Sequence, residues 1–218
     1  MKQSSKTTHS PPAPHLALRR LPTQERARAT VELVLEAAAT EIDRLGLDKL
    51  TTKRIATAAG LSVGAIYEYF PNKEAILHAL ADSWQQKVLE AIDAPHPRHG
   101  GNRDIFAYLN DQFSLVAKLY QDRPGLSTVI PLLASVPDLA ALGRAHDDLA
   151  AASIASALAH YAPKADAREL DAAARCIGIV CHHVLVAALT HRVAPAELLF
   201  ANMRACLVAI ATQLILER

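Results

Sequence analysis

Hydroxyl, phenol and ammonium side chains gather within residues 51–77, in the stretch TTKRIATAAGLSVGAIYEYFPNKEAIL. Thr52 stands at the expected beginning of a short helix, where hydroxyls and free backbone N–H groups can hold a phosphate. Tyr67 and Tyr69 offer phenol hydroxyls a few residues later. Lys73 places a positive charge at the start of the next expected helix, against the local helix dipole. A phosphate contact would explain that placement, so these residue types indicate nucleic-acid binding.

The same stretch has the residue spacing of a helix-turn-helix. Ala56, Gly60 and Ile66 stand at relative offsets of 0, +4 and +10. They supply a small residue where two helices cross, a glycine that can take positive φ in the turn, and an apolar residue that closes the core. Ser62 is predicted to cap the second helix, whose first residues face the major groove in this motif. Gly64 would let that helix approach the duplex closely, within reach of phosphates and thymine methyl groups.

The rest of the chain predicts helices and no row of strands. Ala and Leu dominate a composition that is 51% hydrophobic and only 5% aromatic, and both residues favour helices. Apolar residues recur at three- and four-residue steps before Gly46, which is expected to end the first helix, begun near Thr23. Further helices are predicted over residues 51–59, 62–69, 71–92, 103–121, 124–133, 138–160, 167–191 and 195–217. The expected fold class is therefore all-α, with about nine helices.

Composition divides the chain into a basic leader and helical parts. Residues 1–22 are rich in Ser, Thr, Pro and His and are predicted to be disordered. Residues 1–30 hold six Lys or Arg and one acidic residue, whereas residues 31–218 hold 17 basic and 21 acidic residues. This asymmetry favours an anionic partner at the N-terminal end, although a solvated leader explains it as well. The stretch APHPRHGG, residues 94–101, marks a predicted domain boundary.

Cysteine usage and hydropathy indicate a cytoplasmic protein. The three cysteines imply no disulfide framework, which fits a reducing compartment. The first 25 residues contain four prolines and no apolar run of signal-peptide length. The longest apolar run, residues 205–215, is shorter than the ~20 residues that cross a bilayer. We therefore expect a soluble chain without a membrane segment.

Two segments raise catalytic or metal chemistry as alternatives. The stretch CIGIVCHHVL contains four side chains of metal-binding type: Cys176, Cys181, His182 and His183. On a helix, residues 176, 180 and 183 share one side and residues 177, 181, 184 and 188 another, so the four do not converge. We predict small core residues here and no metal site. The stretch AHDD, residues 145–148, is interpreted as a solvated helix face, because the sequence identifies no partner that would activate a nucleophile.

The stretch 51–77 resembles the DNA-binding signature of the tetracycline-repressor (TetR) family of bacterial regulators. Order and spacing match without gaps, and the upstream residues 26–51 resemble the first helix of the family. The resemblance runs from Thr23 to Leu80; beyond it, only chain length and helix count match. The matching elements are Thr51, Ile55-Ala56, Ala59-Gly60-Leu61-Ser62, Gly64, Ile66-Tyr67, Tyr69-Phe70, Asn72-Lys73-Glu74 and Leu77.

The resemblance implies an all-helical homodimer without a cofactor. It assigns a helix-turn-helix DNA-binding domain to residues 23–71, a connecting helix to 72–93, and a ligand-binding and dimerisation domain to 94–218. In such proteins the last two helices of each subunit form the dimer interface, and effector binding shifts the connecting helix and releases the operator. A ligand-released repressor of a pseudo-palindromic double-stranded operator is the leading expectation. Alternatives are an activator or a ligand-blind regulator on the same fold, and then a helical metal sensor or enzyme.

Carried onto this chain, the resemblance gives ten expected DNA-binding residues. They are Arg26, Arg28, Thr52, Lys53, Ser62, Val63, Gly64, Tyr67, Tyr69 and Lys73. Val63 and Gly64 offer no hydrogen bonds to bases, so shape readout or the basic leader is expected to carry more of the specificity.

Apolar stripes on three C-terminal helices predict an effector pocket. They consist of Phe106, Leu109, Phe113, Ala117 and Tyr120; of Leu142, His146, Leu149 and Ser153; and of Cys176, Val180 and His183. If the stripes converge, the pocket is mostly apolar with few polar anchors, as small-molecule sites tend to be. We expect a small, mostly apolar effector, although the same stripes would equally form plain core. The expected ligand-binding residues are Phe106, Phe113, Tyr120, His146, Leu149, Ser153, Cys176, Val180 and His183.

Overall fold

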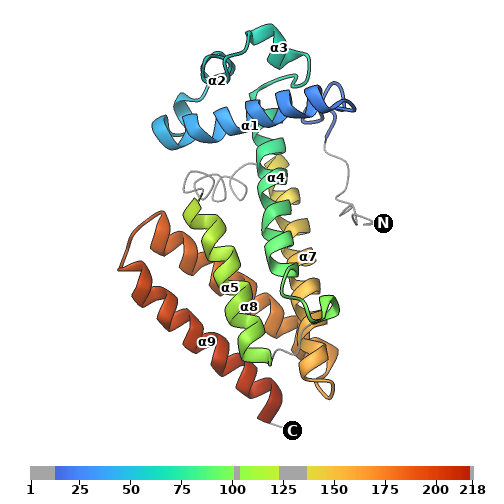
Figure 1. Ribbon diagram of the computed structural model, residues 1–218, viewed down its shortest axis with the longest axis vertical. Coiled ribbons are helices and arrows are strands. Elements are labelled where there is room, and N and C mark those ends of the chain that lie inside the picture. The colour runs from blue at the N-terminus through green and yellow to red at the C-terminus, as the bar shows by residue number, and fades with distance from the viewer. Residues whose placement is uncertain (1–12, 101–103, 123–136, 217–218) are drawn as a thin grey trace. The chain divides into compact units, whose positions relative to one another are not determined.

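The computed structural model describes residues 13–100, 104–122 and 137–216, and within these ranges it is helical with no strand (Figure 1). The predicted all-α fold class is confirmed. The predicted helix over residues 124–133 lies outside the described ranges. The described α-helices are α1 Glu25–Leu45, α2 Thr52–Ala59, α3 Val63–Tyr67, α4 Lys73–Asp93, α5 Ile105–Asp122, α7 Pro137–Tyr161, α8 Ala167–Leu189 and α9 Ala196–Leu216, with 3-10 turns η1 Leu47–Lys49 and η2 Pro97–His99.

The chain forms two compact units. The described residues of the first unit are 13–82 and 137–145, and those of the second are 83–100, 104–122 and 146–216. The division falls inside α4, between Asp82 and Ser83. The predicted connecting helix therefore contributes one half to each unit.

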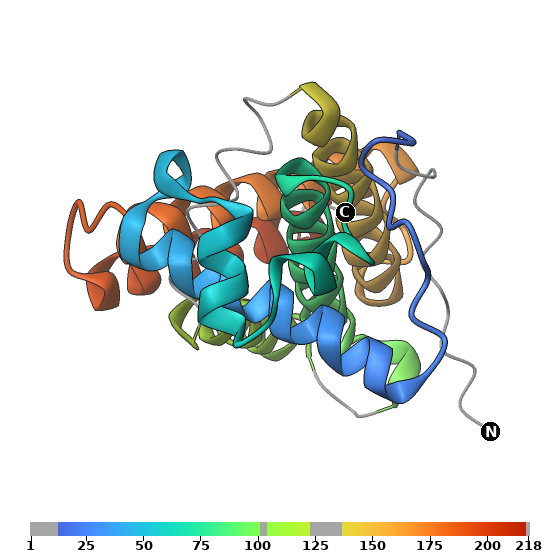
Figure 2. The same ribbon diagram turned by 90° about the horizontal axis from the view of Figure 1, so that it is seen from above.

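In the first unit, α1, α2 and α3 share a small apolar core. Val34, Ala38 and Ile42 are buried on α1, at the three- and four-residue steps that the sequence predicted. Ile55 of α2 and Ile66 of α3 are fully buried. Helices α2 and α3 lie on one side of α1 (Figures 1 and 2). Packing of these short helices, rather than helix propensity, is what keeps them folded.

Local side-chain chemistry fixes the ends of α2 and α3. Thr51 caps α2 by accepting a hydrogen bond from the backbone N–H of Arg54 at 3.3 Å. Gly60 ends α2 with φ 67° and ψ 27°, in the left-handed region that glycine enters at no steric cost. Ser62 then caps α3 by accepting from the N–H of Ala65 at 3.1 Å. The two predicted caps and the predicted glycine turn are confirmed.

Residues 13–22 contact the rest of the first unit, and residues 1–12 of the predicted leader lie outside the described ranges. Leu16 is buried, with 5% of its surface exposed. The backbone N–H of Arg19 donates to the carbonyl of Tyr69 at 2.8 Å. The side-chain amide of Asn72 donates to the carbonyl of His15 at 3.0 Å. The second half of the leader thus lies against the segment that follows α3.

In the second unit, α5, α8 and α9 pack together. Helix α5 buries one face, which includes Tyr108, Leu109 and Phe113, and the ring of Phe113 meets that of Phe200 on α9 edge to face at 5.4 Å. Helices α8 and α9 lie side by side (Figure 1). A capping box starts α8: Asp166 accepts from the backbone of the first turn, and Glu169 accepts from the N–H of Asp166.

Candidate nucleic-acid interface and effector site

The N-terminal end of α3 is exposed and almost free of bulky side chains. Ser62, Val63 and Gly64 are all exposed, whereas Ile66, two residues further on, is fully buried. A Cβ atom added at Gly64 would meet only the Oγ of Ser62, at 3.7 Å. The helix therefore presents a smooth end to solvent while its opposite side anchors it in the core. Such an end can enter a major groove closely.

Polar groups of predicted DNA contacts lie on α2, at the end of α3, just after α3 and at the start of α4. Lys53 on α2 is exposed, and Thr52 is partly exposed. Tyr67, with 39% of its surface exposed, closes α3, and Tyr69 follows it. Lys73 begins α4 and forms no ion pair within the described part of the chain. These residues lie in one unit and leave hydroxyl and ammonium groups available for phosphates.

Asn72 fixes the start of α4, where Lys73 lies. Its side-chain oxygen accepts from the N–H of Ala75 at 2.7 Å, while its amide group holds the carbonyl of His15. Arg26 and Arg28, the other two predicted contacts, are exposed at the start of α1. The Nε of Arg28 donates to the carbonyl of Pro22 at 3.3 Å, which leaves most of its guanidinium donors unused.

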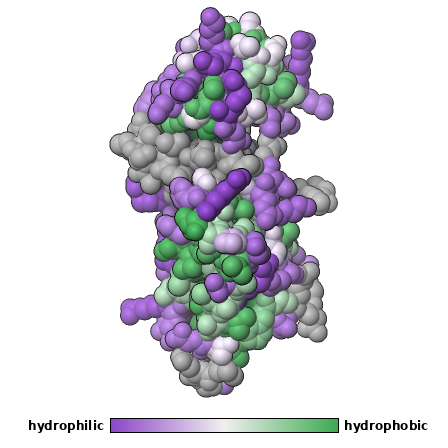
Figure 3. Space-filling view, turned by 90° about the vertical axis from the view of Figure 1, so that its left-hand side faces the viewer, coloured by the Kyte–Doolittle hydropathy of each residue, from purple (hydrophilic) through white to green (hydrophobic). Residues whose placement is uncertain are grey.

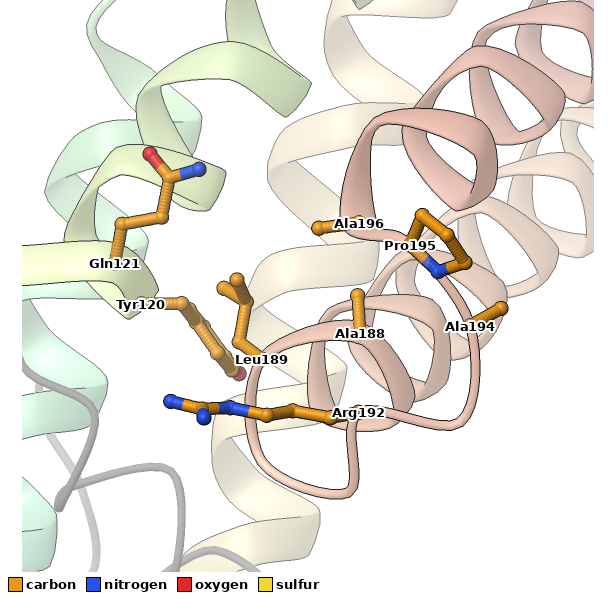
Figure 4. A pocket seen from close by; sticks show the side chains of 8 residues that line it. All are labelled: Tyr120, Gln121, Ala188, Leu189, Arg192, Ala194, Pro195 and Ala196. Carbon is orange, nitrogen blue, oxygen red and sulfur yellow. The ribbon is translucent and has the colours of Figure 1, made fainter.

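A hollow of about 570 Å³ opens in the second unit between the end of α5, the end of α8 and the start of α9. Small apolar residues form most of its wall (Figure 4). Arg192 is the one charged side chain that the described residues place in the wall, and its backbone has a positive φ of 49°. The lining consists of Tyr120, Gln121, Ala188, Leu189, Arg192, Ala194, Pro195 and Ala196.

Tyr120 connects this hollow to the interior of the second unit. Its ring meets Trp84 of α4 edge to face, with ring centroids 5.2 Å apart. Its hydroxyl is hydrogen-bonded to Nδ1 of His182 on α8, at 3.0 Å. Burial raises the pKa of Tyr120 well above its usual range and lowers the pKa of His182 to about 4, with a further lowering from His183. Both groups are therefore neutral at neutral pH.

The low pKa of His182 predicts a pH-dependent stability. Between pH 6.5 and about 4 the unfolded chain takes up a proton at His182 and the folded chain does not. The free energy of unfolding should therefore keep its full value above pH 6.5 and should fall by about 2–3 kcal/mol towards pH 4.5. In His182→Gln, which cannot titrate, this part of the fall should be missing. Urea unfolding of both proteins at pH 7 and 4.5 measures it; equal falls would contradict it.

The other predicted ligand-binding residues are only partly brought together. Phe113 is buried against Phe200, and Ser153 donates to a carboxylate oxygen of Asp93 at 3.5 Å. His146, Leu149 and Val180 are partly exposed. Phe106, Cys176 and His183 lie at the surface, and the ring of His183 bonds the carbonyl of Ile179 on its own helix. Of the nine predicted residues, only Tyr120 lines the hollow.

Sequence reasoning missed Arg192 and His182 as site residues. Arg192 is exposed in the turn between α8 and α9, where no periodic pattern identifies a residue of the wall. His182 is adjacent to the predicted His183, but the structure turns His182 towards Tyr120. His182 is identified by its hydrogen bond to Tyr120, which joins two helices. The periodicity of one helix does not reveal such a contact.

The thiols and histidines of α8 are spread over exposed and partly buried positions. Among the described residues, no group of three or more His, Cys, Asp or Glu side chains is placed to hold a metal ion. Cys176 and Cys206 are exposed and Cys181 is partly buried; burial and the neighbouring thiols raise the pKa of Cys181 to about 12.

Helices α8 and α9 expose an apolar face. Ile179 on α8 keeps 60% of its surface exposed, and Leu198 and Val208 on α9 keep 59% and 48%. Apolar residues dominate the lower part of the surface in Figure 3. Both helices are long and apolar enough to cross a membrane by length and composition, a test that the core helix of a soluble protein also passes. Large contiguous apolar patches on a protein surface are typical of interaction sites.

Two family models cover most of the chain. Residues 34–80 match the model for bacterial regulatory proteins of the tetR family, and residues 104–209 match the tetracyclin repressor-like C-terminal domain. Together with the helix-turn-helix geometry, these matches define a DNA-binding transcriptional regulator and not an enzyme. The chain belongs to the TetR family.

Curated relatives are similar to this chain over part of its length. The nucleoid occlusion factor SlmA of Haemophilus ducreyi is 34% identical over 71 residues, 33% of this chain and 34% of that protein. The HTH-type transcriptional regulator YvdT of Bacillus subtilis is 31% identical over 94 residues, 42% of this chain and 47% of that protein. The chain thus spans about a third to a half of the length of these curated relatives.

Solved structures share the fold over most of the chain. A TetR-family regulator from Syntrophomonas wolfei superposes with a TM-score of 0.71 at 14% identity, over 88% of this chain and 99% of that one. A SmeT–triclosan complex superposes with a TM-score of 0.61 at 19% identity, over 84% and 90%.

Proposed function

We propose that the protein is a ligand-released repressor that binds a pseudo-palindromic operator as a homodimer in the cytoplasm. The observation that carries the proposal is the end of α3, which is capped by Ser62, exposed, and bare at Gly64. The same unit carries the side chains proposed to bind phosphates, on α2, after α3 and at the start of α4. A dimer would set two such ends about one DNA turn apart, so the bound sequence should have two-fold symmetry.

The apolar face of α8 and α9 supports a homodimer. A second copy of the same face would remove Ile179, Leu198 and Val208 from water, through a two-fold contact in which each residue is used twice. Dimer interfaces of this kind are more apolar than the rest of a protein surface.

The hollow beside Tyr120 supports a small-molecule effector. Its wall is mostly apolar, with the guanidinium of Arg192 and the amide of Gln121 as polar groups. The bound molecule we propose is therefore small and mostly apolar, with an acceptor group that these donors can meet. Tyr120 lines the hollow and also touches Trp84 on α4, the helix that leads into the first unit. An effector that moves Tyr120 would bias the position of α4.

The experiment that tests the proposal is selection of bound duplexes from a random DNA pool by the purified full-length chain, followed by an effector screen. We expect a recovered sequence with two-fold symmetry, bound with an affinity that falls steeply between ~50 and ~200 mM salt. An effector should raise the melting temperature, change the fluorescence of Trp84, the chain's single tryptophan, and release the recovered DNA. Recovery of no sequence would contradict operator binding.

A ligand-blind regulator is the second candidate, favoured by one observation. Several matched relatives are nucleoid occlusion factors, a name that mentions no small molecule, and their similarity covers 33–49% of this chain. For this candidate the selection would still return a symmetric site, but a chemically diverse screen would shift neither the melting temperature nor Trp84 fluorescence.

A further inference from the structure

We infer that residues 13–22 form a docked arm that binds the DNA backbone beside the site read by α3, through Arg19 and Arg20. The inference rests on the proposed operator binding and adds to it a second contact surface. The arm is defined here as residues 13–22, and it belongs to the same unit as α2, α3 and the first half of α4.

Three contacts hold the arm in place. Leu16 is its apolar anchor, with 5% of its surface exposed, and a turn positions it through a bond from its N–H to the carbonyl of Ala13 at 2.8 Å. Asn72 clamps the carbonyl of His15 at 3.0 Å while it caps α4. The backbone N–H of Arg19 reaches the carbonyl of Tyr69 at 2.8 Å. The anchor, the clamp and this backbone bond make the arm part of the folded unit.

The docking brings arginine to the edge of the predicted interface. Nη1 of Arg19 donates to the carbonyl of Tyr67 at 3.3 Å, and Tyr67 is itself a predicted DNA contact. That bond uses one of the five N–H donors of a guanidinium, so most of its donors remain for another acceptor. Arg19 and Arg20 are both exposed.

Charge in the arm favours phosphate as the acceptor. The arm has two arginines and no acidic residue. Glu68 adjoins Tyr67 and Tyr69, but no ion pair joins it to Arg19 within the described part of the chain. An exposed pair of guanidinium groups without a carboxylate partner fits the phosphates of a duplex. Because the arm is already ordered, binding DNA would cost little conformational entropy.

The test compares Arg19→Ala/Arg20→Ala with the full-length wild type on duplexes selected by the wild type, trimmed to the symmetric site or extended on both sides. Each phosphate contact adds about 0.9 to the slope of log affinity against log salt, so the double variant of a dimer should lose about 2–4 from that slope. Its affinity for the extended duplex should fall about tenfold or more at ~150 mM salt. The wild type should prefer the extended duplex, and the double variant should not.

Three further variants separate the arm from general charge and from misfolding. Lys118→Ala/Arg168→Ala removes the same charge from exposed positions of the second unit and should bind like the wild type. Arg19→Lys/Arg20→Lys keeps the charge and should retain most of the salt slope. Leu16→Ser keeps both arginines and removes the anchor; with an unchanged circular dichroism spectrum, it should lose most of the preference for the extended duplex.

Each failure has its own meaning. If the double alanine variant matches the wild type in affinity, salt slope and duplex preference, the arm does not bind DNA and the inference is overturned, while operator binding stands. If only Leu16→Ser matches the wild type, docking does not position the arginines, which also overturns the inference. If the wild type binds none of the duplexes, the proposed function fails. The inference about the arm then fails as well, because it rests on operator binding.

Discussion

Replacing Gly64 with leucine should abolish tight operator binding while the protein stays folded. Gly64 is exposed on α3, its φ is not in the left-handed region, and a Cβ there would meet only the Oγ of Ser62 at 3.7 Å. Leucine is a better helix former than glycine by roughly 0.8 kcal/mol, so stability should be unchanged or slightly raised. The substitution should lower only the affinity for DNA, because the end of α3 approaches the duplex.

The expected loss follows from the number of contacts that a bulky side chain would break. A good bidentate contact to a base is worth about 1–3 kcal/mol, and a dimer whose α3 is held away from the groove would lose contacts of this size in both half-sites. The affinity of Gly64→Leu for the selected duplex should therefore fall by about 30-fold to 10,000-fold, and that of Gly64→Ala by much less. Fluorescence anisotropy of a labelled duplex gives the affinities, and urea unfolding gives the stability.

Gly60→Ala is the matched control, since the two glycines are four residues apart. Gly60 has φ 67°, and nothing lies within 4 Å of an added Cβ. Alanine there would destabilise the folded state only through the left-handed backbone, by about 1–2 kcal/mol. Gly60→Ala should thus lower the free energy of unfolding and leave the affinity of the folded protein unchanged, the reverse of Gly64→Leu. Wild-type affinity in Gly64→Leu would show that the end of α3 does not approach the duplex.

The parts of this fold that depend on neighbouring residues could be predicted from the sequence. Thr51 and Ser62 cap helices through bonds to residues three positions ahead, and Gly60 ends α2 by its own backbone freedom. Most described helices begin and end within about two residues of the predicted bounds for the same reason: caps, prolines and glycines act locally.

The parts that depend on distant residues could not be predicted. The leader has the composition of a disordered segment, and only the contacts of Leu16 and of His15 with Asn72, 57 positions away, give residues 13–22 a place. Helix α8 is apolar on most sides, so its periodicity did not identify the residue that faces Tyr120. His182 makes that contact, and His183 lies at the surface.

Placing one aspartate on each of α8 and α9, as Ile179→Asp/Val208→Asp, should convert the protein from a dimer to a monomer. Ile179 is 60% exposed and Val208 is 48% exposed in the single chain, so the monomer tolerates a charge at both positions. In the proposed dimer both positions are buried, and a two-fold contact repeats each substitution. Burying four unpaired carboxylates would cost several kcal/mol, so the dimer dissociation constant should rise by more than about 1,000-fold.

Loss of the dimer should carry over to DNA. Two linked half-site readers bind about 100-fold to 10,000-fold more tightly than one, because the second contact is intramolecular. The double variant should therefore lose that factor on the symmetric duplex but bind an isolated half-site as the wild-type subunit does. Light scattering coupled to size-exclusion chromatography gives the oligomeric state, and anisotropy on full and half sites gives the affinities.

A charge on an apolar surface outside these two helices separates a specific interface from a general loss of solubility or stability. Leu33 on α1 is 51% exposed and belongs to the first unit, so Leu33→Asp should leave the oligomeric state unchanged. A dimeric Ile179→Asp/Val208→Asp protein would exclude the α8 and α9 face as the interface. A monomeric double variant that keeps full affinity for the symmetric site would instead separate dimerisation from operator reading. Since both helices also border the hollow, the monomer allows one more distinction: retained effector binding would show that each subunit holds a complete effector site.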